Sequence, residues 1–217
     1  MNLYPLTYED PVFRPPGEAQ SLLVQVTIGC SHNRCSFCGM YRTKKFRIRG
    51  EEEIADDLER AAFYFNKRKE VIRKIFFCDG DALAAPSNLL LTVAKIAKKF
   101  FPGLRRIGIY ATAQNVLNKT EEELEALYHE NLSIAYLGLE SGSDDVLQFV
   151  GKGNSAEEAI EAGQRLRLKN WQTSLIVMLG LGGQALSSAH REATAKVVSA
   201  ISPRFLSFLT TVAVPET

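Results

Sequence analysis

The chain has 217 residues, a length that favours one domain, and 46% of them are hydrophobic, enough to bury a sizeable core. The 26 Lys and Arg residues nearly balance the 25 Asp and Glu residues, so the net charge of +1 gives no general case for nucleic-acid binding and leaves only a local basic patch open. No apolar run approaches the roughly 18 residues of a membrane span, and the first 20 residues lack the features of a secretory signal, so we expect a cytoplasmic protein without membrane association.

Six short apolar runs are predicted as strands. Most of them are continuously apolar rather than alternating, which is typical of strands buried on both faces of a parallel sheet. They cover residues 22–28, 74–78, 106–110, 134–139, 174–179 and 205–212.

Helical patterns lie between these runs. Apolar residues at 54, 58, 61, 62 and 65 share one helix face behind the acidic residues 51–53, whose charges favour a helix N-terminus. Four further helices are predicted from their first residues: Ser87 caps 88–100, Thr120–Glu123 and Ser155–Glu158 are capping boxes, and Ser187 or Ser188 opens a helix to about residue 200.

This alternation predicts an α/β fold with right-handed parallel crossovers. A full eight-unit barrel needs about 250 residues, so six units predict a partial (β/α)6 TIM-like barrel that lacks its last helix. Residues 1–20 are predicted as an N-terminal Pro-rich extended segment and 21–217 as the core domain, incomplete at its C-terminus. A bare last strand exposes apolar surface, so we expect an oligomer, a partner that completes the barrel, or a longer chain.

Polar residues and glycines follow five consecutive predicted strands. In parallel α/β sheets, ligands bind beyond the carboxyl ends of the strands, so these residues are predicted to meet at one rim. The five groups are a cysteine loop from Cys30 to Cys38, Asp79–Asp81, Thr112–Asn115, Glu140–Ser143 and Gly180–Gly183. Strand-to-helix turns also use Gly, Ser and Asp for local reasons, which explains each group alone but explains the cysteines poorly.

Three of the four cysteines, Cys30, Cys35 and Cys38, lie within nine residues. Without a secretory signal, such a cluster favours metal binding over a disulfide framework. Three loop thiolates suit a four-iron cluster with one iron left open. The alternative is zinc, with His32 or Cys78 as the fourth ligand; Cys78 itself is more typical of a small buried apolar residue.

These motifs resemble the radical S-adenosylmethionine (radical SAM) superfamily over residues 20–212, in particular the branch of coproporphyrinogen oxidases, methylthiotransferases and Elongator-type enzymes. The resemblance implies that Cys30, Cys35 and Cys38 hold a [4Fe-4S] cluster whose open iron binds S-adenosylmethionine. Here four residues separate Cys30 from Cys35, where the family usually has three.

The resemblance also implies a set of cofactor contacts. Phe37 matches an aromatic that leans toward the adenine, and Glu140, followed by Ser141, matches a residue near the ribose and carboxylate. Asp79, Gly80 and Asp81 stand where the family presents acceptors to the cofactor ammonium, and Gly180 and Gly182 stand in its adenine-contacting segment. Thr112 and Gln114 end the third strand within reach of the ribose or carboxylate. For each of these residues, the alternative to a cofactor contact is a local structural role, namely a turn, a helix cap or tight packing.

The implied function is a radical enzyme that reductively cleaves S-adenosylmethionine to a 5′-deoxyadenosyl radical, with a flavodoxin or ferredoxin as electron donor and an unknown substrate. The alternatives are a non-catalytic iron–sulfur, heme or cofactor-binding homologue and, less favoured, a zinc-stabilised binding module. Five cations between Arg42 and Arg49 predict a solvated face, or else a patch for an anionic substrate or donor protein.

Overall fold

Six parallel strands form one sheet in the order β1-β4-β5-β6-β7-β8 in the computed structural model, which describes residues 6 and 8–212. The strands are β1 Leu22–Gln25, β4 Lys74–Cys78, β5 Arg106–Ala111, β6 Leu132–Glu140, β7 Gln172–Leu179 and β8 Phe205–Thr210. Neighbouring strands pair in parallel throughout. The predicted α/β partial barrel is therefore confirmed.

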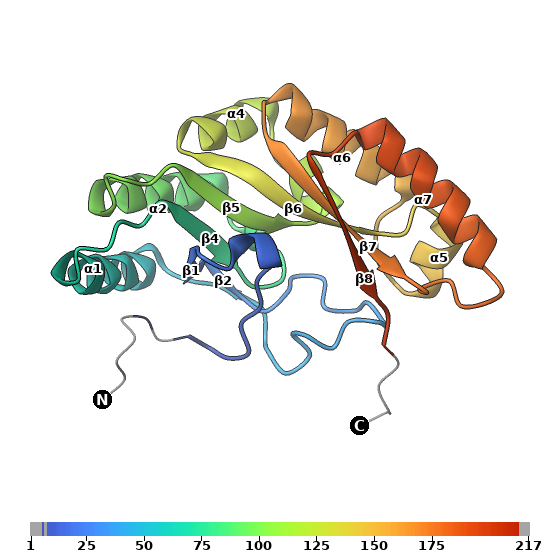
Figure 1. Cartoon of the computed structure of the whole chain (residues 1–217), viewed down its shortest axis with the longest axis horizontal. Coiled ribbons are helices and arrows are strands. Elements are labelled where there is room, and N and C mark those ends of the chain that lie inside the picture. The colour runs from blue at the N-terminus through green and yellow to red at the C-terminus, as the bar shows by residue number, and fades with distance from the viewer. Residues whose placement is uncertain (1–5, 7, 213–217) are drawn as a thin grey trace.

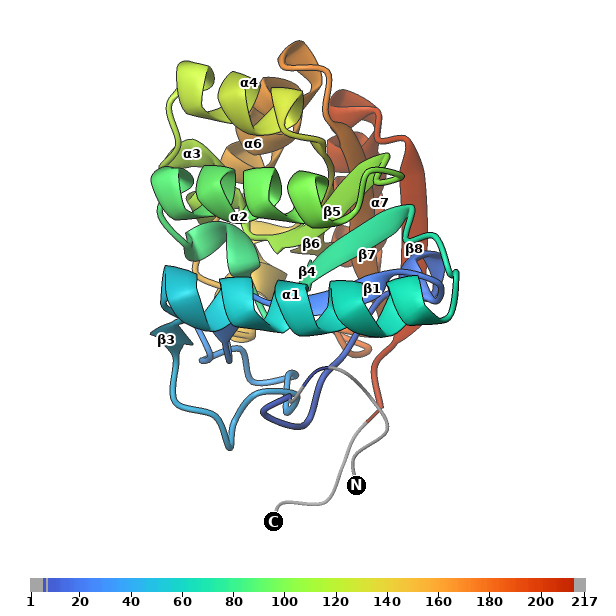
Figure 2. The same ribbon diagram turned by 90° about the vertical axis from the view of Figure 1, so that its left-hand side faces the viewer.

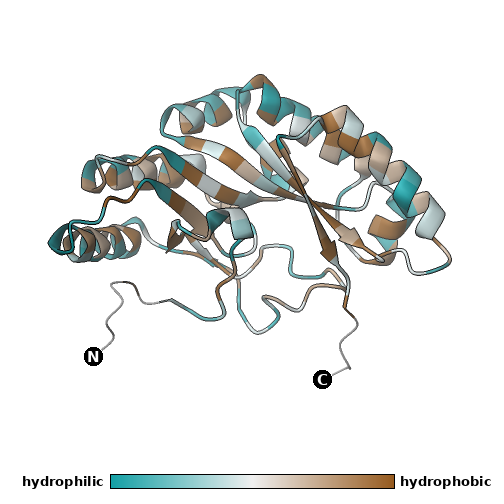
Figure 3. Cartoon of the chain, viewed as in Figure 1, coloured by the Kyte–Doolittle hydropathy of each residue, from teal (hydrophilic) through white to brown (hydrophobic). Residues whose placement is uncertain are grey.

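The helices cover the outer, convex side of this curved sheet (Figures 1 and 2). They are α1 Glu51–Lys67, α2 Ser87–Phe100, α3 Ala113–Leu117, α4 Glu121–His129, α5 Asp144–Phe149, α6 Ala156–Leu168 and α7 Ser187–Ile201. Apolar strand residues such as Ile75, Ile109 and Leu137 point to that side and form the main core with the helices. Colouring by hydropathy shows apolar strands beneath helices whose outer faces are polar (Figure 3).

The inner, concave side of the sheet carries a smaller aromatic core. Phe76 and Tyr136 pack there with Cys78 and Ile134, and Tyr110 contacts both rings edge-on. The N-terminal segment crosses this side and forms the 3-10 turn η1 Pro16–Glu18 (Figure 1). The Glu18 carboxylate is fully buried, where it accepts hydrogen bonds from Tyr136 (2.6 Å) and Arg106 (2.5 Å).

Two local differences from the predicted elements affect the site. The first predicted strand divides at Val26: β1 joins the main sheet, whereas β2 Thr27–Ile28 pairs antiparallel with β3 Arg47–Ile48. The hairpin formed by β2 and β3 holds the cysteine loop between its strands. Helix α2 begins at Ser87 itself, with Pro86 at the N-cap position and no side-chain cap, so the predicted Ser87 cap is wrong.

The last described strand, β8, is exposed on both faces. Phe205, Leu206, Phe208 and Leu209 are 39–56% exposed, and no helix follows β8 within residues 8–212. None of the helices in the described part of the chain combines the length and the apolar character that a membrane span requires.

Candidate functional site

The cysteine loop leaves β2 at the carboxyl edge of the sheet. Gly29 turns the chain with a φ of +77°, and Cys30, Cys35 and Cys38 follow as free, partly buried thiols. The amide of Cys38 donates to the carbonyl of Cys35 (3.1 Å), and the Arg42 guanidinium donates to the carbonyls of both residues (2.8 Å to Cys35 and 3.1 Å to Cys38). The loop is thus ordered by its own backbone and by one cation.

Three of the four residues between Cys30 and Cys35 are bonded to neighbouring elements, so the segment is not a free bulge. The amide of Ser31 donates to Asp81 (2.9 Å), the His32 ring lies 2.7 Å from the carbonyl of Gly151, and the Asn33 amide donates to the carbonyl of Tyr41 (2.9 Å). Asn33 takes a φ of +43°, a conformation that asparagine tolerates better than most residues. The extra residue of the wider spacing therefore has a place in the structure.

Gly80 makes room for the first cysteine. A Cβ atom on Gly80 would lie 2.4 Å from the Cβ of Cys30 and 3.1 Å from its Sγ, closer than such atoms approach. The Gly80 amide also donates to the carbonyl of Gly29 (2.9 Å). Close packing against Cys30 therefore requires a glycine at position 80, which was predicted as a cofactor contact.

A buried ion pair stands beside the thiols. Glu140, which ends β6 with a φ of +62°, accepts from the Lys152 ammonium at 3.0 Å, and both side chains are about 10% exposed. Burial alone would lower the pKa of Lys152, but the negative charges of Glu140 and Cys35 outweigh it, so that pKa is raised. Lys152 was not predicted as a site residue; its only signal in the sequence is a Gly-Lys-Gly triplet shortly after the Glu140 motif.

The thiols themselves have raised pKa values. Burial is the main cause for both Cys30 and Cys35; the carboxylate of Asp81 adds to it for Cys30, while the Lys152 charge acts in the opposite direction on both thiols. Because thiolates rather than thiols bind metal, Lys152 favours the form of both residues that a cluster needs.

The two aspartates after β4 have different surroundings. The Asp79 carboxylate is fully buried and bound by three donors, namely Gln25, the Gly29 amide and Lys44. Asp81 accepts from Ser31 and from Asn115 (3.0 Å), and burial raises its pKa despite these bonds. Asp81 therefore faces the cysteine loop and Asp79 serves to anchor it.

Thr112 and Gln114 lie at the end of β5. The Thr112 hydroxyl caps α3 by accepting from the Asn115 amide (3.2 Å), and the exposed Gln114 donates to Asn118 (3.3 Å). The residue of this group that reaches the site is Asn115, through Asp81.

Ser141 connects the Glu140 turn to α7. Its hydroxyl lies 2.8 Å from the His190 ring and accepts from the Ser143 amide (3.0 Å), while Thr194 accepts from the Gly142 amide (2.9 Å). Ser141 and His190 thus hold the strained turn that ends in Glu140, and this contact of His190 was not predicted from the sequence.

Phe37 reaches across to the end of β7. It packs against a small apolar cluster formed by Val146, Val150 and Leu181, and Leu181 lies between Gly180 and Gly182 in the sequence. Gly180 has a φ of +83° with open space around it, whereas a Cβ on Gly182 would lie 3.0 Å from the carbonyl of Leu186. The structure thus brings Phe37 and the glycine-rich segment together, with Gly182 needed for packing and Gly180 lying on the open side.

Of the five cations between Arg42 and Arg49, Arg42, Lys45 and Arg47 are exposed, as predicted for a solvated face, whereas Lys44 and Arg49 are buried. Lys44 and Arg49 are buried in ion pairs with Asp79 and Asp57 (2.8 Å each), and Arg47 pairs with Glu9 and Glu53. Arg42 donates to the carbonyls of Cys35 and Cys38, as described above. Four of the five cations therefore have a hydrogen-bond or ion-pair partner within the chain.

The Tyr41 hydroxyl is buried near Asp79 and Tyr110. Tyr41 is 3% exposed, its hydroxyl has no hydrogen-bond partner among the described residues, and burial raises its pKa. An unpaired buried hydroxyl costs free energy, so Tyr41 marks a polar position next to the cysteine loop without a protein partner.

The donor set fits an iron–sulfur cluster better than one zinc ion. In residues 6 and 8–212, no three His, Cys, Asp or Glu side chains converge on a single-ion position. The proposed fourth zinc ligands are also committed elsewhere, because His32 bonds to Gly151 and Cys78 is buried within β4. The three free thiols lie at different positions along one loop, beside the buried ammonium of Lys152. This arrangement fits an iron–sulfur cluster, in which each thiolate binds a different iron.

Comparison with known proteins supports this assignment. The family model described as the Radical SAM superfamily matches residues 24–193. No curated protein sequence matches the chain significantly.

Several solved structures share the fold. Coproporphyrinogen III oxidase from Escherichia coli aligns with a TM-score of 0.69 at 19% identity over 90% of this chain and 44% of its own. A radical S-adenosylmethionine methyltransferase from Kitasatospora setae gives 0.67 at 16% identity over 88% and 36%, and methylornithine synthase gives 0.64 at 14% over 88% and 53%. The chain spans about half or less of the length of these structures, and at such identities the likeness shows the fold alone.

Proposed function

Because this chain belongs to the radical SAM superfamily, we propose that it is an enzyme that cleaves S-adenosylmethionine reductively at a [4Fe-4S] cluster held by Cys30, Cys35 and Cys38. The product is a 5′-deoxyadenosyl radical that abstracts a hydrogen atom from a substrate. The observation that carries the proposal is the placement of three free thiols beside the buried Lys152–Glu140 pair at the carboxyl edge of the sheet.

When bound by Cys30, Cys35 and Cys38, the cluster would supply one-electron redox chemistry: with an electron from an external donor, such as a flavodoxin or ferredoxin, it would allow reductive cleavage of the sulfonium of S-adenosylmethionine to methionine and a carbon radical. The protein binds and orients the cofactor. In this proposal, Lys152 pairs with the cofactor carboxylate and Glu140 accepts from ribose hydroxyls; the support is that their charged groups lie together beside the thiols.

The adenine has a candidate position between Phe37 and the open side of Gly180. The ring of Phe37 offers a stacking surface, and the glycine allows the backbone to approach a flat base. Asp81 lies close to Cys30 and offers an acceptor for the cofactor ammonium, and Asn115 donates a hydrogen bond to Asp81.

The test is 5′-deoxyadenosine formation after anaerobic reconstitution with iron and sulfide, using dithionite as reductant and added S-adenosylmethionine. We expect product from the wild type and from Cys78→Ala, whose thiol is buried in β4 outside residues 30–38, and none from Cys35→Ala. Wild-type protein that carries about four irons and four sulfides yet forms no product would instead support the non-catalytic cofactor-binding homologue.

A further inference from the structure

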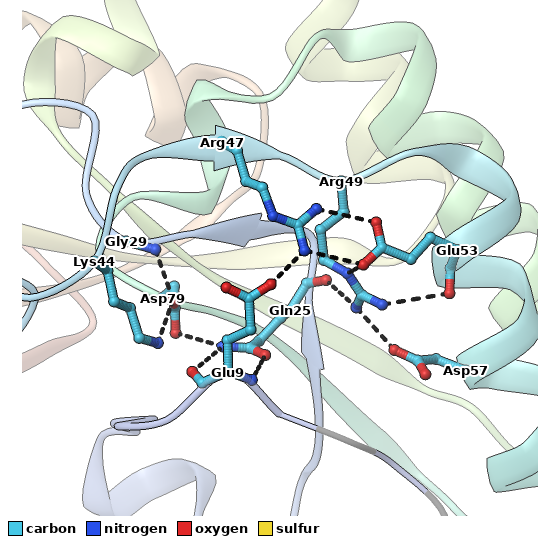
Figure 4. A network of polar contacts seen from close by, with 9 residues as sticks. All are labelled: Glu9, Gln25, Gly29, Lys44, Arg47, Arg49, Glu53, Asp57 and Asp79. Atoms are coloured by element: carbon cyan, nitrogen blue, oxygen red, sulfur yellow. Dashed lines mark hydrogen bonds and ion pairs between the residues drawn. The ribbon is translucent and has the colours of Figure 1, made fainter.

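A polar network lies under the cysteine loop and joins it to the rest of the barrel (Figure 4). Its centre is Asp79, a fully buried carboxylate directly after β4 with a φ of +69°. Oδ2 of Asp79 accepts from the Gly29 amide at 2.7 Å and from the Lys44 ammonium at 2.8 Å. Oδ1 accepts from Gln25 at 3.1 Å.

These donors come from the two ends of one loop. Gly29 immediately precedes Cys30, and Lys44 lies six residues after Cys38, so a single carboxylate oxygen joins the start and the end of the segment that carries all three thiols. The side chains of Lys44 and Asp79 are 5% and 0% exposed. Charge-assisted bonds in such a dry position are strong and poorly screened by salt.

We infer that Asp79 and Lys44 form a loop clamp, a positioning pair that fixes the cysteine loop in the geometry that the cluster needs. The inference rests on the proposed function for its biological meaning. It assigns Asp79 to holding the loop rather than to contacting the cofactor, because its bonds to Gln25, Gly29 and Lys44 occupy both carboxylate oxygens.

The remaining contacts of the network hold Gln25 in place and thereby stabilise Asp79. Gln25 exchanges hydrogen bonds with the backbone of Glu9 (3.0 and 3.1 Å), which fixes the side chain that holds Oδ1 of Asp79. Arg49 donates to the carbonyl of Gln25 (2.8 Å) and pairs with Asp57 of α1. Arg47 belongs to the same network but pairs with Glu9 and Glu53 at the surface, outside the clamp.

The test uses the full chain with Lys44→Met, Asp79→Asn and the matched control Arg47→Gln. The first readout is chymotrypsin cleavage between residues 31 and 46 of the apo-protein, with sites located by mass spectrometry. Because one charge-assisted bond is lost in Lys44→Met and Asp79→Asn, we expect cleavage in the loop to rise about tenfold in both. Arg47→Gln and the conservative Lys44→Arg should match the wild type.

The double variant Lys44→Met/Asp79→Asn separates positioning from general stability. Removing both charges leaves no buried unpaired ion, so its melting temperature should return toward that of the wild type. Loop cleavage should stay as high as in the single variants, and iron per chain after reconstitution should be below that of the wild type, because the ion pair that joins the end of the loop to Asp79 is absent. Recovery of loop protection together with melting temperature, or unchanged cleavage in the single variants, would overturn the clamp.

The proteolysis readout does not depend on cofactor chemistry. A wild-type protein that binds iron but forms no 5′-deoxyadenosine would refute the proposed function and leave the clamp standing, whereas unclamped variants with normal loop protection would refute the clamp alone.

Discussion

Lys152 and Glu140 show how one charge pair constrains the site. Their side chains form an ion pair at 3.0 Å in surroundings that are about 90% shielded from solvent. Two buried charges that compensate each other are tolerated, but either one alone carries an uncompensated desolvation cost.

Lys152→Met is therefore expected to lower the free energy of unfolding of the apo-protein by up to about 3 kcal/mol, because Glu140 would remain buried without its cation. The double variant Glu140→Gln/Lys152→Met should recover most of that loss, since both charges are gone. Urea unfolding measures both values. A double variant as unstable as the single one would show that the ion pair is not the source of the loss.

S-adenosylmethionine binding to the reconstituted protein should fall in both variants of this pair, because the proposed partner of the carboxylate is absent in each. Isothermal titration would show the loss, and binding at wild-type affinity would remove Lys152 from the proposed cofactor site.

The contact between Gly80 and Cys30 predicts a steric effect. Gly80→Ala would place a methyl group 2.4 Å from the Cβ of Cys30, so Cys30 must move and the iron content after reconstitution should drop. Gly39→Ala is the matched control, because Gly39 follows Cys38 directly and a methyl group there would meet no atom within 4 Å. Equal iron content in the two variants would contradict the packing argument.

The unpaired hydroxyl of Tyr41 predicts an unusual response to a small deletion. Tyr41→Phe removes a buried polar atom that has no partner among the described residues, so the melting temperature of the apo-protein should stay the same or rise slightly. If the same variant of the reconstituted protein binds S-adenosylmethionine or substrate more weakly, the hydroxyl has its partner in the bound state. A large loss of apo-protein stability would contradict the assignment of an unpaired group.

The secondary-structure elements fall into two groups: those whose sequence shows a periodic pattern of apolar residues and those whose sequence does not. Strand β4 matches its predicted range of 74–78, and the long helices α1, α6 and α7 lie where apolar periodicity and capping residues placed them. The hairpin of β2 and β3 was missed, because two-residue strands show no periodicity and their pairing depends on contacts 20 residues apart.

The site shows the same division. The cysteines were predicted as site residues from their spacing and Glu140 from its motif, since both are local signals, and the structure places Glu140 near Cys35. Lys152 and His190 were not found, because their roles depend on burial against Cys35 and on contact with Ser141, neither of which the sequence records. Among the cations between Arg42 and Arg49, the burial of Lys44 and Arg49 was not predicted, because the sequence does not reveal that Asp79 and Asp57 lie beside them.

The capping boxes allow a test at the level of a helix. The Ser155 hydroxyl accepts from the Glu158 amide (3.1 Å) at the start of α6, so Ser155→Ala should cost about 1 kcal/mol of unfolding free energy. Ser187 begins α7, which has no side-chain cap, so Ser187→Ala should change stability by less than half as much. Chemical denaturation of both variants checks the difference, and equal losses would show that the cap bond contributes little.

At the scale of the whole molecule, the sheet has one covered and one bare end. Strand β8 presents Leu206 and Phe208, 39% and 56% exposed, beyond the part of the sheet that the helices cover. Exposed apolar edges promote association, so the 217-residue chain is expected to self-associate.

The double variant Leu206→Lys/Phe208→Lys should reduce this association in sedimentation velocity experiments, because any contact through β8 would then have to bury two charges. Phe63→Lys, on the outer surface of α1, is the control and should leave association unchanged. A wild-type chain that sediments as a monomer would refute the expectation.

The attachments of the cysteine loop also set an order of events during synthesis. Residues 30–38 reach the ribosome exit early, yet the groups that hold them, Asp79, Asp81, Val150 and Gly151, follow by about 40 to 120 residues. Chains emerge at roughly 5–20 residues per second, so the thiols spend several seconds exposed and unrestrained before their supports exist. Iron loading of this protein is therefore expected to follow translation of roughly the first 150 residues, and the nascent thiols depend on the reducing power of their surroundings until then.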